Sequence, residues 1–391
     1  MSMEANRKNR VIIFALILIL GCCRIYAQNN DINKSPSPVL KSYTEKKMNN
    51  RTNWDVALQR SKSGDAYQFM ALRRDFGFIN EMIYSNDFSL IENGMILIDN
   101  IIASAETSSS IEGNKTNRDR FKGWISQNEN NEYYKEVALY ESYSFFYITQ
   151  FLYILKNTGW VDESENNRKW WSETRDFVEE NVWCKWEERS KVLKNKEYWY
   201  FLRQRIHMGS HWAGIAMYLG EMTEDKEIKK QTKEVQRQYD MLLKRNLKNV
   251  NNAYIWNSTY DDVTGTNAQG ANKPIIQDVS HGNHVVAYII AAHEFGSPNW
   301  TKNDITKLVN TLKNVVYDKQ KNIFRDNVDG TVNASRPGWG NFIADGWVKL
   351  ASYDTDVRKI LDEFGKTDKL TKHYQSLQYE ASMFKSNQSK K

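Results

Sequence analysis

Two kinds of helical segment alternate along this chain, and their alternation limits the fold more than any other feature of the sequence. One kind is apolar on nearly every side, as in residues 211–222 (HWAGIAMYLGEM), 284–296 (HVVAYIIAAHEFG) and 341–354 (NFIADGWVKLASYD). The other kind is amphipathic and rich in Lys and Glu, as in Glu224–Leu247. A helix that is apolar all round is buried, whereas an amphipathic helix lies between core and solvent. The pattern therefore predicts inner helices surrounded by outer ones.

Helical hairpins of this kind bury their apolar faces by stacking on one another. A closed ring of them is an α/α toroid, and an open row of them is a superhelical repeat. The repeats in this chain are irregular and carry long inserted loops, which favours the toroid. Only five Pro and few alternating Val, Ile and Thr residues occur, which argues against an all-β chain. We expect an all-α protein, an α/α toroid (a barrel of helical hairpins) with long functional loops.

Periodicity and capping residues predict individual helices. They cover residues 65–85, 87–107, 131–157, 165–189, 197–222, 224–247, 277–296, 303–321, 342–353, 356–365 and 370–386. Asp278 or Ser280 is the expected N-cap of the helix at 277–296. Two long polar stretches, residues 107–131 and 248–276, lie between helices. Loops of this length are more often functional than accidental.

The N-terminus has the pattern of a processing segment. Arg7, Lys8 and Arg10 precede the apolar run Val11–Leu20, which is short for a membrane span and suited to a secretory signal. Either Cys22 is lipidated within a lipobox-like ILGC sequence, or cleavage follows residue 27. We therefore expect a signal peptide at 1–27, a flexible tether rich in Asn, Ser, Lys and Pro at 28–51, and a catalytic α/α-toroid domain at 52–391.

Cysteine usage and charge limit the location and the partners. Beyond Cys22 and Cys23 only Cys184 remains, so the mature chain has no internal disulfide. Together with the N-terminal pattern, this predicts a bacterial periplasmic or outer-membrane-anchored protein. The net charge of +6 is spread out and includes no Lys/Arg block that would grip nucleic acid. The excess charge suits a polyanionic substrate, and an ordinary solvated surface fits it better still.

Four of the six histidines lie in two short segments. His207 and His211 share one helical stripe with Arg203, and His281 and His284 share one face at the start of the helix at 277–296. Any one of them taken alone is as often a satisfied core histidine as a functional one. Four clustered at the starts of two inner helices favour an active-site wall.

The histidine spacings, His-x3-His and His-x2-His, also suit a metal site. Asp261, Asp262 or Asp278 would add oxygen ligands. However, the sequence contains neither an HExxH motif nor paired cysteines. We therefore expect no metal, and no organic cofactor is implied.

Two loop segments have both an ordinary and a functional interpretation. Residues 256–262 (WNSTYDD) form either a common turn-rich loop or a substrate cover, in which Tyr260 is an acid and Trp256 and Asn257 bind sugar. Residues 336–340 (RPGWG) form either a turn or a sugar platform. In the platform, Trp339 stacks on a ring and Arg336 pairs with a carboxylate.

Other enzyme classes lack support in this sequence. The GxSxG, P-loop, Rossmann and kinase motifs are absent. A glycoside hydrolase needs two facing carboxylates, and nothing singles out a pair among Glu141, Asp278 and Asp345. The better-populated set is His, Tyr, Asn and Arg, which suits β-elimination at a uronic acid. That reaction needs a neutral base, donors that neutralise the carboxylate, and an acid for the leaving oxygen.

The chain resembles a known family, the bacterial α/α-barrel polysaccharide lyases that act on uronate glycans such as alginate and glucuronan. The resemblance spans roughly residues 55–385. It rests on the helix alternation, the His-bearing segments 207–212 and 280–284, and the ending VDGT…GWGNFIADGW at 328–347. In such lyases an Asn-His pair like Asn283-His284 places a carboxylate neutraliser beside a base, and a later Tyr that follows an Arg is the acid. This chain departs from that pattern, because no suitable Tyr follows His284, and Tyr260 follows His211 without a preceding Arg.

The sequence therefore predicts a secreted polysaccharide lyase acting on a uronate-rich, alginate-like glycan. Either His211 or His284 is the expected base and Tyr260 the acid, while Asn283 with Arg203 or Arg205 binds the carboxylate. The remaining substrate-binding candidates are His207, His281, Asn257, Trp256, Arg336 and Trp339. The alternatives are a glycoside hydrolase or epimerase on the same scaffold, and a glycan-binding lipoprotein without activity.

Overall fold

A computed structural model describes residues 53–115, 117–129, 132–203, 205–260, 275–367 and 376–388, together with residues 40, 41, 43 and 45. The chain divides into two units, Met1–Lys41 and Ser42–Lys391. The architecture given below is that of the second unit. The expected signal segment and nearly all of the expected tether lie outside the described residues, as do Asp261 and Asp262.

The described part of the chain is mostly helical, which confirms the all-α prediction. The first group of helices consists of α4 (Ala66–Tyr84), α6 (Ala138–Asn157), α9 (Ile206–Met222), α11 (Val279–Glu294), α15 (Ser376–Gln388) and the 3-10 helix η5 (Trp347–Ser352). The second group consists of α3 (Trp54–Ser61), α5 (Ile91–Ala103), α7 (Glu165–Val178), α8 (Lys185–Lys194), α10 (Lys226–Asn246), α12 (Lys302–Asn310) and α13 (Thr355–Gly365). None of the helices in the described ranges is both long and apolar enough to cross a membrane.

Short irregular elements connect these helices. Two π-helical turns, η2 (Glu179–Cys184) and η3 (Thr311–Val316), and two 3-10 turns, η1 (Trp160–Asp162) and η4 (Trp339–Asn341), extend or join them. Antiparallel two-stranded hairpins are formed by β1 (Glu106–Thr107) with β2 (Lys122–Gly123), β3 (Lys248–Val250) with β4 (Ala253–Ile255), and β5 (Tyr317–Asp318) with β6 (Ile323–Phe324).

Two helix starts that have a side-chain cap lie where the sequence predicts them. Asp65 accepts the backbone N–H of Tyr67 at the start of α4, and Asp278 accepts that of His281 at the start of α11. Each cap satisfies one of the N–H groups that lack a partner in the first helical turn. The confirmed cap at Asp278 fixes the position of the histidines that follow it.

Predicted helices differ from the structure in several places. The helices expected at 87–107 and 303–321 end before strands β1 and β5, and α3 was not expected. Three further differences have local reasons. The segment expected to begin at residue 197 becomes helical only at Ile206, because Asn195 and Tyr198 have positive φ values of 47° and 59°. Likewise α6 begins at Ala138 rather than 131, after Tyr134 at φ 56°. The expected helix at 342–353 is reduced to η5, which follows the irregular backbone of Gly346.

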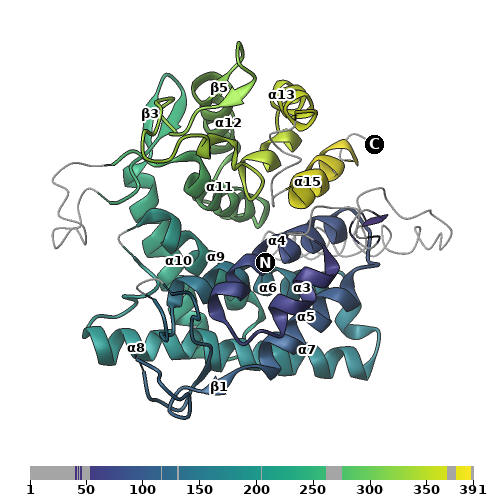
Figure 1. The fold of residues 1–391 in the computed structure, drawn as a ribbon, viewed down its shortest axis with the longest axis vertical. Coiled ribbons are helices and arrows are strands. Elements are labelled where there is room, and N and C mark those ends of the chain that lie inside the picture. The colour runs from purple at the N-terminus through teal and green to yellow at the C-terminus, as the bar shows by residue number, and fades with distance from the viewer. Residues whose placement is uncertain are drawn as a thin grey trace, which may run out of the picture. The chain divides into compact units, whose positions relative to one another are not determined.

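Helices of the first group pack on one another, and those of the second group cover them (Figure 1). The first-group contacts are α4 with α6, α6 with α9, α9 with α11, α11 with η5, η5 with α15, and α15 with α4. The covering contacts are α3 and α5 on α4, α10 on α9, α12 on α11, and α13 on η5. Helix α7 covers α6, where the indole of Trp171 donates to the Leu152 carbonyl over 2.9 Å.

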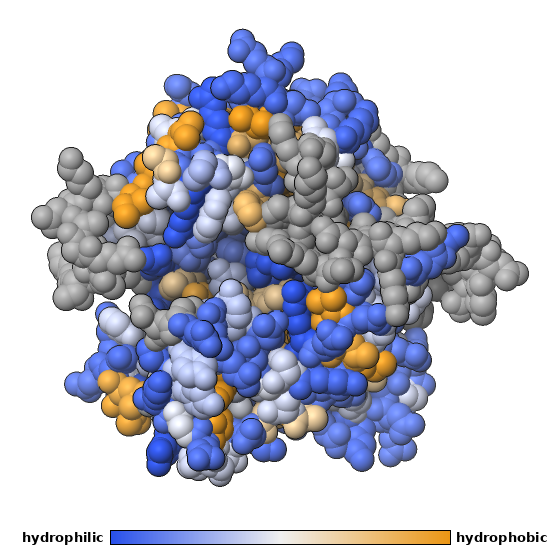
Figure 2. Space-filling view, viewed as in Figure 1, coloured by the Kyte–Doolittle hydropathy of each residue, from blue (hydrophilic) through white to orange (hydrophobic). Residues whose placement is uncertain are grey.

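Burial follows the two helix types that the sequence distinguishes. In α9 only Met208 and Glu221 are not buried, whereas α10 buries a single stripe that includes Ile228, Val235 and Leu243. On the face shown in Figure 2, apolar side chains form small separate patches in a mainly hydrophilic surface. The alternation of fully buried and amphipathic helices is thus confirmed.

Buried polar side chains join the first-group helices to one another. Asn80 on α4 donates to Gln150 on α6 over 2.9 Å, and Gln150 donates to the Tyr218 hydroxyl on α9 over 2.9 Å. Glu81 on α4 binds Lys349 on η5 at 2.6 Å and Lys385 on α15 at 3.5 Å. Buried polar groups of this kind fix how neighbouring helices are aligned, because each must find its partner.

The ion cluster of Glu81 leads to a stability prediction. Burial raises the pKa of the Glu81 carboxyl, but the charges of Lys349 and Lys385 outweigh that effect and lower the pKa to about 2. Substitution Glu81→Gln leaves two lysines without their buried partner and should lower the free energy of unfolding by about 3–5 kcal/mol at pH 7. The stabilisation is complete above pH 4.5, the ordinary pKa of a glutamate side chain, and is lost as the pH falls toward 2.

Chemical denaturation of both proteins at pH 7 and pH 3 measures this difference. The matched control is Glu363→Gln, which breaks the exposed pair of Glu363 with Lys366 and should leave stability unchanged. Equal stability of Glu81→Gln and the unsubstituted chain at pH 7 would contradict the assigned role of Glu81.

Candidate functional site

Extended segments bring the starts of α9 and α11 together. Arg205, just before α9, forms an isolated β-bridge with Thr259, and Asn257 forms another with Ile276. Asp278, the cap of α11, forms a bridge with Asn327. The irregular segments around residues 257, 276 and 327 thus place the two histidine-bearing helix starts side by side.

The four candidate histidines form one cluster. The ring centroids of His207 and His281 are 4.4 Å apart, and those of His211 and His284 are 4.6 Å apart. His207 and His284 lie 6.5 Å apart, which links the two pairs. The sequence placed these residues at two helix starts, and the fold makes them neighbours.

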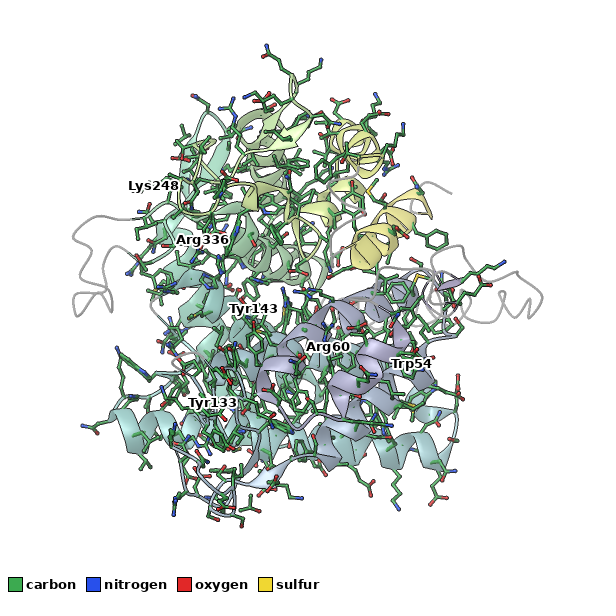
Figure 3. All side chains as sticks on the ribbon, in the orientation of Figure 1. Trp54, Arg60, Tyr133, Tyr143, Lys248 and Arg336 are labelled. Atoms are coloured by element: carbon green, nitrogen blue, oxygen red, sulfur yellow. The ribbon has the colours of Figure 1, made fainter. Side chains whose placement is uncertain are left out.

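Two further side chains belong to this cluster, and the sequence interpretation did not assign them a role. Tyr143, which Figure 3 labels, belongs to α6. Its ring lies 4.2 Å from that of His211 and 4.8 Å from that of His284. The guanidinium of Arg73 on α4 lies 5.0 Å from the Tyr143 ring centroid and pairs with Asp345 at 3.6 Å. The sequence signal that could have indicated Arg73 is a charged residue inside an otherwise apolar helix, because such a charge is seldom buried without a partner.

Three of the histidines are buried, with exposed fractions of 3% for His207, 0% for His211 and 4% for His284. No described residue forms a hydrogen bond with Nδ1 of His207, with either ring nitrogen of His211, or with Nδ1 of His284. An unsatisfied buried polar group costs about 1–3 kcal/mol, so a cluster of them indicates a functional constraint.

Burial lowers the pKa of all three imidazoles well below 6.5, and nearby positive groups lower it further. For His211 and His284 these groups include Arg73, and for His207 they include Arg205 and Arg336. Each imidazole is therefore neutral at neutral pH. A neutral imidazole with an open nitrogen is able to accept a proton.

A more exposed set of side chains adjoins the cluster. Nδ1 of His281 lies 2.8 Å from Oδ2 of Asp278, and Arg336 pairs with the same oxygen at 3.6 Å. The Arg336 guanidinium lies 4.3 Å from the Trp339 ring centroid. The side chains of His281 and Arg336 are 24% and 39% exposed, so they mark the solvent side of the cluster. Arg336 and Trp339 are thus together, as the platform interpretation expects.

Two arginines precede α9 without a neutralising partner. Arg203 and Arg205 are half-buried, and within the described ranges no carboxylate lies at ion-pair distance from either one. Burial lowers the pKa of Arg203 and the charge of Arg205 lowers it further, while Tyr200 and Glu132 act in the opposite direction. Partly desolvated cations that form no ion pair attract an anionic ligand.

The structure gives Asn283 a role other than the expected one. Its side chain is fully buried, and its Nδ2 donates to the carbonyl of Phe342. Its Oδ1 accepts the backbone N–H groups of Gly346 at 3.0 Å and Trp347 at 3.2 Å. Because these bonds already use the amide, the predicted carboxylate-binding role of Asn283 is wrong, and the residue instead anchors η5 to α11.

The loop residues before α11 are also more buried than the sequence interpretation expects. Trp256 is 0% exposed and stacks on Trp347 at 5.9 Å, so the predicted stacking of Trp256 on a sugar is wrong. Asn257 is 5% exposed and takes part in the β-bridge with Ile276. Tyr260 is 3% exposed and follows Thr259, the bridge partner of Arg205.

The carboxylates that a hydrolase would need are occupied. Glu141 binds Nζ of Lys185 and the indole of Trp186, both at 2.8 Å. Asp278 is paired with His281 and Arg336, and Asp345 with Arg73, as described above. Burial raises the pKa of Asp278, but the hydrogen bond and charge of His281 and the charge of Arg336 outweigh it and leave the pKa below its usual value.

The polar loop at 107–131 has a structural explanation. Arg189 on α8 binds Glu136 at 2.5 Å and Asp119 at 2.8 Å, and Ser108 donates to Glu136 over 2.6 Å. These buried bonds fasten the loop to α8. Its length therefore does not by itself indicate a function.

In the part of the chain that the structure describes, no group of three or more His, Cys, Asp or Glu side chains is placed to hold a metal ion.

No family model, curated protein or solved structure matches this chain. Any function must therefore be argued from the cluster itself.

The buried histidines allow a direct test of their charge state. Because their folded-state pKa values lie below 6.5, the imidazoles of His207, His211 and His284 should remain neutral at pH 6 in spectra of ¹⁵N-histidine-labelled protein. The unfolded chain binds these protons more readily, so the cluster should also reduce stability as the pH falls below 6.5. Single His→Gln variants assign the signals. Protonation midpoints near 6.5 would contradict the buried, neutral state.

Proposed function

We propose that this chain is a polysaccharide lyase that cleaves a uronate-rich, alginate-like glycan by β-elimination, like the bacterial α/α-barrel lyases that its sequence resembles. The observation that carries the proposal is the set of buried, neutral imidazoles with open ring nitrogens at the starts of α9 and α11. Arg203, Arg205 and Arg336 supply positive charge beside them. This combination of a neutral base and cationic surroundings suits proton removal next to a carboxylate.

The proposed scaffold is an α/α toroid. Its support is the order of contacts among the first-group helices, which returns from α15 to α4 after passing through α6, α9, α11 and η5. The covering helices α10, α12 and α13 each pack on the first-group element that lies next to them in the sequence, as hairpins of a toroid do. The histidine cluster belongs to neighbouring members of the inner ring.

In the proposed reaction, His211 or His284 takes the proton from C5 of a uronic acid. The electron pair forms the C4=C5 double bond, the C4–O4 bond breaks, and the leaving oxygen receives a proton from a tyrosine. Arg203 and Arg205 neutralise the substrate carboxylate as charge develops on it. Because the Asn283 side chain is bound to η5, the two arginines alone neutralise the substrate carboxylate.

Tyr143 is better placed than Tyr260 to be the acid. Its ring contacts both candidate bases, and the neighbouring Arg73 stabilises the phenolate left after proton donation. Tyr260 lies on the segment bridged to Arg205, at the start of α9. We therefore add Tyr143 to Tyr260 as a candidate for the acid.

The N-terminal pattern supports a location for this activity. We propose export across the inner membrane, with the chain either free in the periplasm or anchored to the outer membrane through Cys22. No organic cofactor takes part in the proposed reaction.

The first test incubates the purified protein with alginate, glucuronan and other uronate glycans, with and without a chelator. Ultraviolet absorbance should rise as the conjugated double bond forms, and a chelator should have no effect. Substitution His211→Gln should lower kcat by roughly 10²–10⁴-fold, the usual contribution of a general base. The matched control is His293→Gln on the same helix as His284, where Nδ1 of His293 contacts the Trp300 carbonyl outside the cluster.

Other outcomes identify the alternatives. Absence of turnover with retained glycan binding would favour the binding lipoprotein. Exchange of the C5 proton without a rise in absorbance would favour an epimerase, and new reducing ends without absorbance would favour a hydrolase. Loss of the rise on adding the chelator would assign the histidines to a metal.

The acid is identified by comparing two conservative variants. Tyr143→Phe removes only the hydroxyl and should lower kcat by about 10²-fold or more while KM changes little, because a proton is transferred only in the transition state. Tyr260→Phe should have a smaller effect on kcat. A larger loss in Tyr260→Phe than in Tyr143→Phe would return the acid role to Tyr260.

A further inference from the structure

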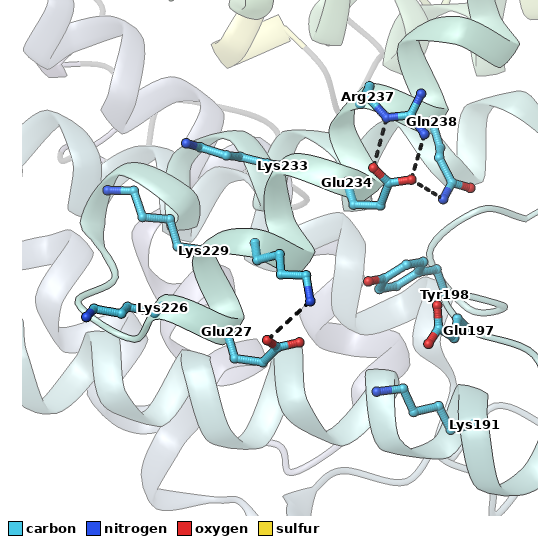
Figure 4. Close-up of a pocket in the computed structure, with 11 residues that line it drawn as sticks. Lys191, Glu197, Tyr198, Lys226, Glu227, Lys229, Lys233, Glu234, Arg237 and Gln238 are labelled. Carbon is cyan, nitrogen blue, oxygen red and sulfur yellow. Dashed lines mark hydrogen bonds and ion pairs between the residues drawn. The ribbon is translucent and has the colours of Figure 1, made fainter.

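A hollow lies on the outer layer of helices, apart from the histidine cluster. It has a volume of about 660 Å³ and is bounded by Lys191 of α8, residues 197 and 198, and the exposed face of α10 (Figure 4). None of its lining residues belongs to the candidate active site. We call this hollow the lysine groove and define it by Lys191, Tyr198, Lys226, Lys229, Lys233 and Arg237.

The lysine groove carries an excess of positive charge. Its lining contains six basic and three acidic side chains. Two of the acidic ones already have partners, because Glu227 pairs with Lys230 at 3.7 Å and Glu234 with Arg237 at 2.7 Å (Figure 4). The charge that remains in the groove is therefore mostly that of lysines.

Three of these lysines lack an ion pair. Within the described ranges no carboxylate lies at ion-pair distance from Lys226, Lys229 or Lys233. Lys226 and Lys233 are exposed and Lys229 is half-buried, so their ammonium groups are accessible to a ligand. A focused group of like charges without counter-ions attracts an anionic chain.

The spacing of the cations suits a polymer rather than a single ion. Lys226, Lys229, Lys233 and Arg237 follow one another at intervals of three or four residues along α10. At a rise of about 1.5 Å per residue, each step is about 4.5–6 Å and the whole row is about 17 Å long. A polyuronate presents one carboxylate per sugar at a similar repeat, so successive sugars would meet successive helical turns.

A second hollow of about 260 Å³ extends this row. It shares Lys233 and Arg237 with the lysine groove and continues toward residues 295–299 after α11. The two hollows thus flank the same stretch of α10 and offer a path longer than one sugar.

An aromatic side chain faces the cations across the groove. Tyr198 lies opposite the lysines of α10 in Figure 4. Burial and the nearby charge of Glu197 raise the pKa of Tyr198 to about 12, so its phenol stays protonated and able to donate a hydrogen bond. Aromatic rings with a polar tip are suited to sugar surfaces.

We propose that the lysine groove is a second, non-catalytic site that binds a carboxylated polysaccharide chain and holds it on the protein. The identity of the chain as a polyuronate rests on the proposed lyase function. A groove on the outer layer keeps the polymer near the protein between turnovers, and two weak sites on one polymer raise the effective affinity of both.

An anionic membrane surface is the main competing ligand. Val192 and Leu193 at the end of α8 are 71% and 50% exposed, and Lys191 adjoins them. A flat bilayer contacts a convex surface, however, whereas the unpaired lysines line a hollow. The concave geometry favours a chain.

Affinity electrophoresis tests the proposal. Native gels contain sodium alginate, sodium polyglucuronate or neutral dextran, and all proteins carry His211→Gln to prevent turnover. Combined Lys226→Gln, Lys229→Gln and Lys233→Gln should weaken binding to the two polyuronates by about tenfold, since three exposed ion pairs together account for roughly that factor. The matched control, Lys302→Gln with Lys319→Gln and Lys321→Gln, removes the same charge from exposed positions elsewhere and should bind like the parent protein.

The outcomes separate this proposal from the proposed function. If binding depends on the groove but the chain with His211 intact shows no turnover, the groove proposal stands and the lyase proposal is rejected. If the chain with His211 intact turns over substrate and the groove variant binds polyuronate as well as its parent, the groove proposal is rejected and the lyase proposal stands. Equal weakening by the control variant would mean general charge attraction and would overturn the groove. Groove-dependent binding to phosphatidylglycerol vesicles with no retardation by polyuronate would replace the chain with a membrane surface.

Discussion

The buried amide of Asn283 is the contact on which the arrangement of the site depends. It binds three backbone groups between Phe342 and Trp347, at a point where Gly346 leaves no room for a side chain, because a Cβ there would overlap the Asn283 carbonyl. The start of α11 is thereby fixed against η5. His284 follows Asn283 directly, so the same contact sets where its imidazole meets His211 and Tyr143.

Local features of the fold were predictable from sequence, and long-range ones were not. The cap Asp278 and the apolar character of α9 and α11 depend on neighbouring residues, so the sequence shows them directly. The late start of α9 depends on backbone angles at Asn195 and Tyr198, which side-chain periodicity does not reveal. The contraction of residues 342–353 to η5 depends on contacts with α11, which are distant in the chain.

The same division applies to the candidate site. The histidines were identifiable because four titratable residues interrupt two apolar helices. The roles of Asn283 and Trp256 were not, since each is decided by partners more than fifty residues away, Gly346 for one and Trp347 for the other. Tyr143 was hidden for a similar reason, because a tyrosine in an aromatic helix becomes distinctive only when α9 and α11 bring histidines against it.

The bond between Glu81 and Lys349 joins residues 268 positions apart, and Lys385 reaches the same carboxylate from still later in the chain. Contacts with such large sequence separation form late, because the loop entropy must be overcome before the bond contributes. A chain that lacked α15 would lose the pair of Lys385 with Glu81 and would expose the flank of α4 that α15 covers. The last described helix of the chain therefore completes the burial of one of the first.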